Sequence, residues 1–294
     1  MSRLRAVAAR TKHALQQAKH RVYLAYKPHR FAVAGRVEPL HRLAHRIRPV
    51  ALDPEVWRGS HLEHTETGAV DTTAPVPRQV FLFWTGDNPL SPARARSLEA
   101  IRAMNPDIDV RLITPENLHE IVLPEHPLHP SYEDLALIHR SDYLRCYVMN
   151  FHGGAYMDLK PPLHPWGPVL DAFDRTDAWF GGYRVPVRLM TPNMPDPRQE
   201  RAMLRLSEVR LGQCGDISRP RSPLTEEWWH ELNRRMDQHA DELARVPGDA
   251  RATNPGYPVG FGELLAQIVD PIQVKYRDHL FYDARCMPSH EDYM

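Results

Sequence analysis

The sequence has few cysteines and no long apolar run, and both absences narrow what the protein can be. Its 294 residues include only Cys146, Cys214 and Cys286, with no CxxC pair. This number and spacing predict neither a disulfide framework nor a zinc cluster, and they favour a reducing compartment. No run approaches the roughly eighteen apolar residues of a membrane-spanning helix, and the first residues lack the apolar stretch of a signal peptide. We therefore expect a cytoplasmic protein.

Common nucleotide-binding and zinc-binding patterns are also missing. Neither the GxGxxG pattern of dinucleotide-binding folds nor the GxxxxGK[ST] pattern of P-loop ATPases occurs, so neither cofactor class is predicted. The 17 histidines include no HExxH pair or other ligand spacing, and we predict no zinc site from them. No aromatic platform or known binding motif accompanies the basic residues, which argues against nucleic acid as a partner.

The formal net charge is zero, but the charges are unevenly distributed along the chain. Residues 1–48 hold twelve Lys or Arg and one acid, which leaves 25 basic and 36 acidic residues of the 37 each in the remainder. Apolar residues recur at helical spacing from Leu4 to Val22, so we expect a basic amphipathic helical arm at residues 1–48. Such an arm can lie on an anionic membrane surface, at the inner face of the cell membrane, or pack on the acidic body, or stay partly disordered. The sequence leaves these alternatives open.

The body of the chain begins with alternating strand and helix patterns. After a polar, proline-broken linker or entry segment at 49–78, the apolar run at 79–84 predicts a buried strand. Ser91 with Pro92 predicts the start of a helix at 91–105, Asn105 and Pro106 predict its end, and a second strand follows at 109–113. A strand, a helix and a strand at this spacing form a βαβ unit. We therefore predict an α/β fold, with a Rossmann-like, mostly parallel sheet and flanking helices, as the catalytic domain at 79–294.

A candidate ligand-binding segment follows in the next helix and strand. Residues 132–151 are predicted to form the longest helix of the body, with Asp142 and Arg145 flanking its buried stripe on one side. The short strand after it ends at Asp158, close to two prolines. Ligands of open α/β sheets bind outside the carboxyl ends of the strands, so Asp158 is placed to meet a diphosphate or a metal ion bound to one. Simpler roles are a surface ion pair between Asp142 and Arg145 and a turn cap at Asp158.

These residues also carry a resemblance to a known family. The runs VPRQVFLFWTGDNPLSP, MNPDIDVRLITPENL, SDYLR and HGGAYMDL, within Pro77 to Pro165, resemble the bacterial capsular polysaccharide synthesis and Och1-like DXD sugar transferases, of the glycosyltransferase family 32 type. The resemblance implies a GT-A type fold and a generally retaining transfer from a nucleotide-sugar donor. SDxLR followed by GGxYxD at this separation is fairly specific, whereas either half alone is weak.

The resemblance also implies roles for individual residues. The aspartate that matches Asp142 contacts the nucleoside of the donor, the arginine that matches Arg145 supports the site, and Asp158 matches the first acid of the DXD motif. The end of the first strand matches the segment that receives the nucleobase. The implied donor-binding residues are Phe83, Trp84, Thr85, Asp142, Arg145, Gly153 and Gly154.

One departure from the family pattern concerns the metal. Lys160 stands where the DXD motif places its second carboxylate, and two carboxylates hold Mn²⁺ or Mg²⁺ against the diphosphate. We expect a divalent cation to remain, held by Asp158, phosphate oxygens and a C-terminal ligand such as His290. Alternatively, the ammonium group of Lys160 neutralises the developing charge, so Asp158 and Lys160 are the catalytic candidates. Asp196 and Glu263 are candidates for contacts with the acceptor or the sugar.

The sequence thus predicts a glycosyltransferase that moves a sugar from a nucleoside diphosphate sugar to a hydroxyl of a glycan or glycolipid acceptor, in polysaccharide or glycoconjugate synthesis. Retention at the anomeric carbon is implied by the resemblance alone. One alternative is a catalytically degenerate protein that binds a sugar nucleotide or a glycan without turnover, because Lys160 replaces an acid. The other is a membrane-associated assembly scaffold whose functional part is the basic arm at 1–48.

Overall fold

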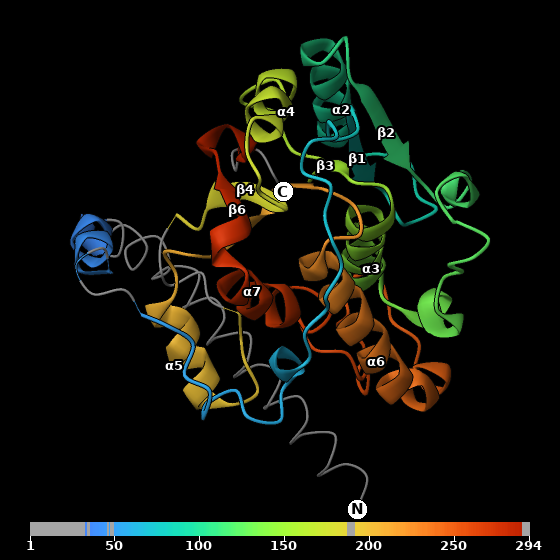
Figure 1. The fold of residues 1–294 in the computed structure, drawn as a ribbon. Coiled ribbons are helices and arrows are strands. Elements are labelled where there is room, and N and C mark those ends of the chain that lie inside the picture. Colours follow the sequence, from blue (N-terminus) through green and yellow to red (C-terminus); the bar gives the residue numbers. More distant parts are fainter. Residues whose placement is uncertain (1–32, 34–35, 46, 48–49, 187–191, 290–294) are drawn as a thin grey trace, which may run out of the picture. The chain divides into compact units, whose positions relative to one another are not determined.

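The computed structural model describes residues 33, 36–45, 47, 50–186 and 192–289 (Figure 1). The chain divides into two compact units, of which the smaller comprises Met1–Val50 with Pro186–Met190. Within the smaller unit, residues 36–45 are helical, and the amphipathic helix predicted from Leu4 to Val22 lies outside the described residues. The larger unit comprises Ala51–Val185 with Thr191–Met294, and it contains the sheet and the candidate site.

The sheet of the larger unit has six strands in the spatial order β2-β1-β3-β5-β4-β6. Strand β5 is antiparallel to both of its neighbours, and the other five strands are parallel to one another. This mixed α/β architecture confirms the predicted α/β fold with a mostly parallel sheet. The strands are β1 (Gln79–Phe83), β2 (Asp109–Ile113), β3 (Gly154–Met157), β4 (Phe180–Arg184), β5 (Leu211–Ser218) and β6 (Leu280–Tyr282).

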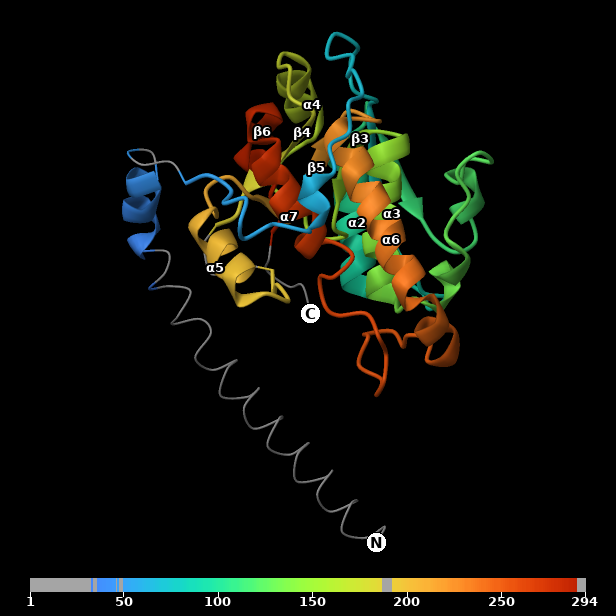
Figure 2. The same cartoon turned by 60° about the horizontal axis from the view of Figure 1, so that its bottom comes forward.

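Helices cover both faces of the sheet, as the alternation of side chains along β1 requires. Phe81 and Phe83 point into one hydrophobic cluster with α3, α6 and α7, whereas Val80 and Leu82 point into another with α2 and α4. The two groups of helices lie on opposite sides of the strands in Figure 1, and Figure 2 shows α6 and α7 in front of the sheet. The helices are α2 (Pro92–Met104), α3 (Leu137–Phe151), α4 (Gly167–Asp174), α5 (Pro197–Arg205), α6 (Pro223–Arg245) and α7 (Ala266–Lys275).

Capping residues fix the ends of the helices. The Ser91 hydroxyl accepts from the backbone N–H of Arg94 at the start of α2, with a proline at the first helical position, as predicted. The expected helix at 132–151 begins later, at Leu137, because the chain first makes a short 3₁₀ helix and then an extended turn at Ala136. It is also not the longest helix: α3 has 15 residues and α6 has 23, so that prediction was wrong.

None of the described helices combines the length and the apolar character needed to cross a bilayer.

The order of the strands creates a switch point beside β1. Strand β2 lies on one side of β1, and the chain then returns to form β3 on the other side of β1. The two crossovers therefore diverge between β1 and β3, and a crevice between such crossovers opens at the carboxyl ends of the two strands. Those ends carry the segments 83–85 and 158–160.

Candidate functional site

Asp158, the first residue after β3, lies at the centre of a cluster of charged side chains. Arg145 on α3 donates to Asp158 Oδ1 at 3.4 Å, and Lys160 Nζ lies 2.8 Å from Oδ2. The Tyr156 hydroxyl donates to Oδ1 at 2.7 Å, and it accepts in turn from Arg145 at 2.8 Å. The guanidinium of Arg145 also stacks over the Tyr156 ring at 4.0 Å from its centroid. The structure thus brings together Arg145, Asp158 and Lys160.

Opposite charges stabilise one another within this cluster. Burial by itself raises the pKa of Asp158, but the nearby Arg145 and Lys160 outweigh burial and hold that pKa below its usual range. Burial lowers the pKa of Lys160, and the Asp158 carboxylate outweighs it and raises that pKa. Lys160 is only 4% exposed, and its ammonium group also lies 3.0 Å from Cys214 Sγ. Lys160 is therefore a buried cation held at the end of a strand, not a solvated surface lysine.

Asp142 lies one helical turn before Arg145 on α3 and is buried. Burial raises the pKa of its carboxyl to about 7; Arg145 lowers this pKa and Asp158 raises it further. A carboxyl that is partly protonated near neutral pH can both donate and accept hydrogen bonds. Asp142 is thus suited to contact hydroxyl or amide groups of a ligand.

Asp216 is a third carboxyl near this cluster, after Asp158 and Asp142, and sequence reasoning missed it. It lies on β5 directly opposite Tyr156, it has no exposed surface, and both carboxylate oxygens lack a hydrogen-bond partner among the described residues. Burial raises its pKa to about 7, with Arg145 lowering and Asp158 raising it. The neighbouring strand has Gly182 here, and a Cβ at Gly182 would lie 3.4 Å from Asp216 Oδ1. The signal in the sequence was an acid inside the run LGQCGDIS, which was not predicted as a strand.

The predicted nucleobase segment follows β1, on the other side of the switch point. The Phe83 ring stacks on Tyr156 with centroids 5.4 Å apart, which links this segment to the charged cluster. The Thr85 hydroxyl donates to the carbonyl of Leu137 at 2.8 Å and lines a cavity of about 50 Å³ at the carboxyl ends of β1 and β2. The Trp84 indole is turned to the surface loop, where it donates to the carbonyl of Asn88 at 2.6 Å.

The remaining predicted residues lie away from these contacts. Gly153 and Gly154 precede and begin β3, at the end of the strand opposite to Asp158, and both have positive φ. Asp196 caps α5 and pairs with Arg198 at 2.8 Å. Glu263 accepts from the backbone N–H of Gly260 at 2.7 Å and lies 2.8 Å from a ring nitrogen of His239. His290 lies outside the described residues.

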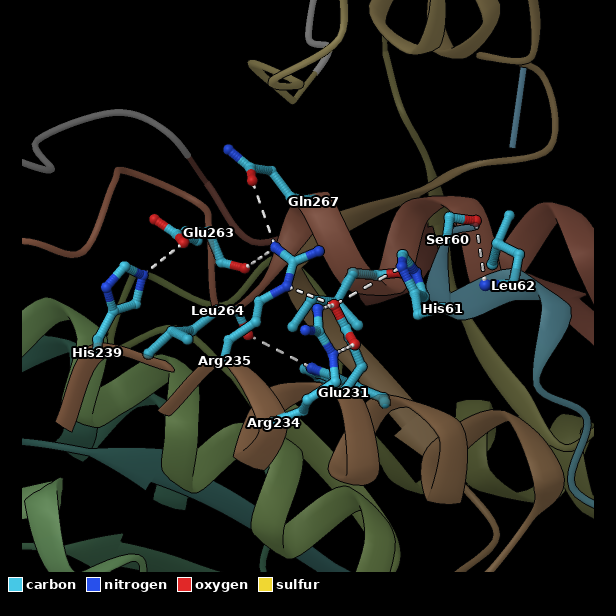
Figure 3. Close-up of polar contacts among 12 residues, drawn as sticks. Ser60, His61, Leu62, Glu231, Arg234, Arg235, His239, Glu263, Leu264 and Gln267 are labelled. Atoms are coloured by element: carbon cyan, nitrogen blue, oxygen red, sulfur yellow. Dashed lines mark hydrogen bonds and ion pairs between the residues drawn. The ribbon is translucent and has the colours of Figure 1, made fainter. Parts of the chain in front are cut away.

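A larger cavity, of about 680 Å³, lies between α6 and the segment 57–64. Its wall carries Glu231, whose carboxylate accepts from Arg234 at 2.6 Å and from Arg235 at 2.7 Å (Figure 3). His61 lies 3.8 Å from the same carboxylate, and burial lowers the pKa of His61 to about 4. This cavity shares no lining residue with the cluster around Asp158. The larger cavity and the charged cluster are therefore two separate candidate sites in the larger unit.

The Mn²⁺ or Mg²⁺ that the resemblance implies does not fit the residues around Asp158. A hard cation needs several oxygen ligands, but both oxygens of this carboxylate are engaged by groups of the protein, two of which are cationic. Among the described His, Cys, Asp and Glu side chains, three ligand atoms close enough to share one ion come together only at His64, Glu66 and His230. Both oxygens of Asp158 are thus committed to the protein's own groups, and the predicted cation remains for a chelation experiment to test.

Comparisons with known proteins give little further guidance. No family model matches the chain, and no curated protein matches it. Among solved structures, a chain titled "PaToxG Glycosyltransferase" is similar at 12% identity, covering 71% of this chain and 89% of that chain, with a TM-score of 0.37. A likeness of this degree carries no argument about activity.

Proposed function

We propose that this protein is a glycosyltransferase that moves a sugar from a nucleoside diphosphate sugar to an acceptor hydroxyl. The observation that carries the proposal is the buried Arg145, Asp158 and Lys160 cluster at the carboxyl end of β3, beside the switch point of the sheet. Ligands of open α/β sheets bind at such points. Two cations fixed at that position are suited to an anionic group, and the leaving group of this reaction is a nucleoside diphosphate.

The chemistry assigned to the cluster is charge neutralisation. As the bond between the sugar and the diphosphate breaks, negative charge grows on the phosphate oxygens, and cations already held in place stabilise it without reorganisation. Lys160 is the catalytic candidate, because its ammonium group acts as a point charge. Asp158 is then a positioning residue, since its carboxylate fixes Lys160 at 2.8 Å and Arg145 at 3.4 Å. We assign no enzymic nucleophile.

The donor is proposed to lie across the switch point. The segment after β1 that contains Thr85 is proposed to receive the nucleobase on one side, and the two cations are proposed to hold the diphosphate on the other. Asp142, next to the cluster, is suited to hydrogen bonds with the hydroxyls of the nucleoside. Retention at the anomeric carbon, the identity of the sugar and a role in capsular or other polysaccharide synthesis are further proposals that rest on the resemblance.

The test begins with a screen of UDP-, GDP- and dTDP-sugars by thermal shift, because a ligand that binds the native state raises the unfolding midpoint. Transfer or hydrolysis of the radiolabelled donor that binds is then measured for wild type, Lys160→Ala and Arg78→Ala. We expect Lys160→Ala to lower kcat roughly 100- to 1000-fold, as the loss of one preorganised charge contact does. Arg78, which pairs with Asp171 at 2.6 Å outside the site, is the control for removal of a cation.

Chelation separates the two accounts of charge neutralisation. Activity that survives exhaustive chelation in the wild type and is lost in Lys160→Ala supports Lys160. Activity that disappears on chelation and returns with Mn²⁺ supports the predicted cation and contradicts a metal-free site. Equal rates in Lys160→Ala and wild type would reject the role of Lys160 altogether.

A second candidate function is binding of a sugar nucleotide without turnover. It is favoured by one observation, that both oxygens of Asp158 are engaged by the protein's own side chains. A donor that raises the unfolding midpoint, but is neither hydrolysed nor transferred, would support this candidate. The proposed membrane contact through residues 1–48 is tested separately, by liposome binding of the chain with and without that segment.

A further inference from the structure

Two histidines and a glutamate from distant parts of the chain converge at the rim of the 680 Å³ cavity. Glu66 Oε1 lies 2.8 Å from His64 Nε2 and 2.7 Å from His230 Nδ1. The three ligand atoms all lie within 4.8 Å of one another. The sharing of one carboxylate oxygen by two imidazole nitrogens places three ligating groups around a single point.

Both sides of this cluster are anchored to one buried group. Glu227 on α6 accepts from the backbone N–H of Glu66 at 3.1 Å and pairs with Lys275 at 2.8 Å. Lys275 in turn donates to the backbone carbonyl of His64. His230 lies three residues after Glu227, one turn further along the same helix. The loop that carries two of the ligands and the helix that carries the third are therefore fixed to each other.

We infer that His64, Glu66 and His230 form a site for a divalent transition-metal ion, with Zn²⁺ as the ion that suits them best. Imidazole nitrogens and a carboxylate oxygen are ligands that zinc prefers, whereas Mg²⁺ and Ca²⁺ prefer oxygen alone. Tetrahedral zinc with bonds of about 2.0–2.2 Å places its ligand atoms roughly 3.3 Å apart. The three ligand atoms lie within 4.8 Å of one another, so a short movement of the side chains brings them to this spacing.

The exposure of the ligands allows this movement and the entry of the ion. The side chains of His64 and His230 are 62% and 55% exposed, and that of Glu66 is 25% exposed. Binding requires the lone pairs of the two ring nitrogens that now face Glu66, so each ring proton must sit on the other nitrogen. The affinity should therefore fall in acid, where protons compete for the same nitrogens.

With three protein ligands, a tetrahedral zinc ion at this site keeps one coordination position open. Three protein ligands plus a water or a ligand is the arrangement of zinc sites that take part in chemistry, whereas sites with a purely structural role are closed by four protein ligands. His64 and His230 both line the cavity that contains Glu231 and Arg235. The fourth place is thus available to water or to an anionic or polar molecule in that cavity. The site shares no residue with the cluster around Asp158, so it does not depend on the proposed transferase activity.

Zinc binding by the full chain tests the inference directly. Purified protein is stripped of metal, and the Kd for Zn²⁺ is measured by competition with a chromophoric chelator, with Mg²⁺ as the comparison ion. The variants are His64→Ala, His230→Ala and Glu66→Gln, and the control is His119→Ala, an exposed histidine outside the cluster. All variants keep the three cysteines, so any thiol contribution is the same in each, and circular dichroism verifies that each variant folds.

We expect the wild type and His119→Ala to bind one Zn²⁺ per chain, and each cluster variant to bind it at least about 10- to 100-fold more weakly. Zinc should also raise the unfolding midpoint of the wild type and of the control, but not that of the cluster variants. Equal zinc affinity in wild type and His230→Ala would place the ion elsewhere and overturn the inference. Failure of the wild type to bind Zn²⁺ would overturn it as well.

Discussion

Replacing Asp216 by asparagine should make this protein more stable at pH 8, although the change removes a charged residue from the core. The carboxyl is fully buried, and neither oxygen has a hydrogen-bond partner among the described residues. An ionised carboxylate in such a place is costly, because the charge loses its hydration without gaining a partner. Asparagine has nearly the same shape and cannot ionise.

The size of the effect follows from the pKa of Asp216, which burial raises from 3.8 to about 7. Each unit of pKa difference between folded and unfolded states corresponds to about 1.4 kcal/mol, so the full shift amounts to roughly 4 kcal/mol. Between pH 4 and pH 7 the native state binds more protons than the unfolded state, and stability falls as the pH rises. Water entry and small movements of neighbouring groups reduce the cost, so we expect Asp216→Asn to gain about 1–3 kcal/mol at pH 8 and close to nothing at pH 4.

Asp270 provides the matched control, because it is equally buried but paired. Its carboxylate accepts from Arg210 at 2.7 Å and from Gln213 at 2.8 Å. Asp270→Asn takes the carboxylate away from Arg210, which is 1% exposed, and breaking a buried ion pair from one side costs about 3–5 kcal/mol. Two isosteric substitutions in neighbouring elements should therefore change stability in opposite directions.

The assay is urea unfolding of wild type, Asp216→Asn and Asp270→Asn at pH values from 4 to 8. Differences between variants at one pH cancel the titration of all other groups. If the difference between Asp216→Asn and wild type does not grow between pH 5 and pH 8, the buried carboxyl is not a neutral acid in the native state. If Asp216→Asn is the less stable protein at pH 8, the carboxylate has a partner that stabilises it, and the reasoning fails.

Two further predictions concern the backbone of β3 and the pH dependence of donor binding. Gly154→Ala should lower the free energy of unfolding by roughly 3 kcal/mol, because φ is +89° and a Cβ would lie 2.8–3.0 Å from atoms of Gln79 and Pro77. The control is Gly167→Ala, where the nearest atom to a Cβ is 3.9 Å away, and it should change the free energy of unfolding little in the same urea assay. Donor affinity should weaken as the pH rises above about 7, by up to about tenfold per unit, as Asp142 loses its proton, and Asp142→Asn should remove this dependence. Calorimetric titration at pH 6 and pH 8 measures it, and equal slopes in both proteins would contradict it.

The elements predicted best were those whose signals are local. The apolar run at 79–84, the cap at Ser91 and the stop before Pro106 all lie inside short windows, and the observed bounds agree with the predicted ones to within a residue. Strand β5 was missed because its pattern is weak and its pairing with β3 and β4 joins segments distant in the chain. An antiparallel strand in a mostly parallel sheet has no signature in its own sequence.

The same distinction applies to the sites. Arg145, Asp158 and Lys160 could be proposed together because a helix, a short strand and a turn carry them within sixteen positions. Asp216 could not, since only the pairing of β5 with β3 places it opposite Tyr156. The sequence also could not predict the cluster of His64, Glu66 and His230, because no short ligand spacing relates the loop before β1 to helix α6.

Lys160 shows why a missing motif residue has to be judged together with its neighbours. Asp142, Asp158 and Asp216 already place three carboxyls near one another, and burial raises the pKa of two of them to about 7. A second DXD acid at position 160 would add a fourth carboxyl to this group, which requires an external cation to be tolerated. Lysine has the opposite effect, because its ammonium group compensates Asp158 at 2.8 Å. Compared with the DXD pattern that the chain resembles, lysine at this position lacks a metal ligand and also lessens the electrostatic need for a metal. The departure from the family pattern is therefore as compatible with a working charged site as with a degenerate one.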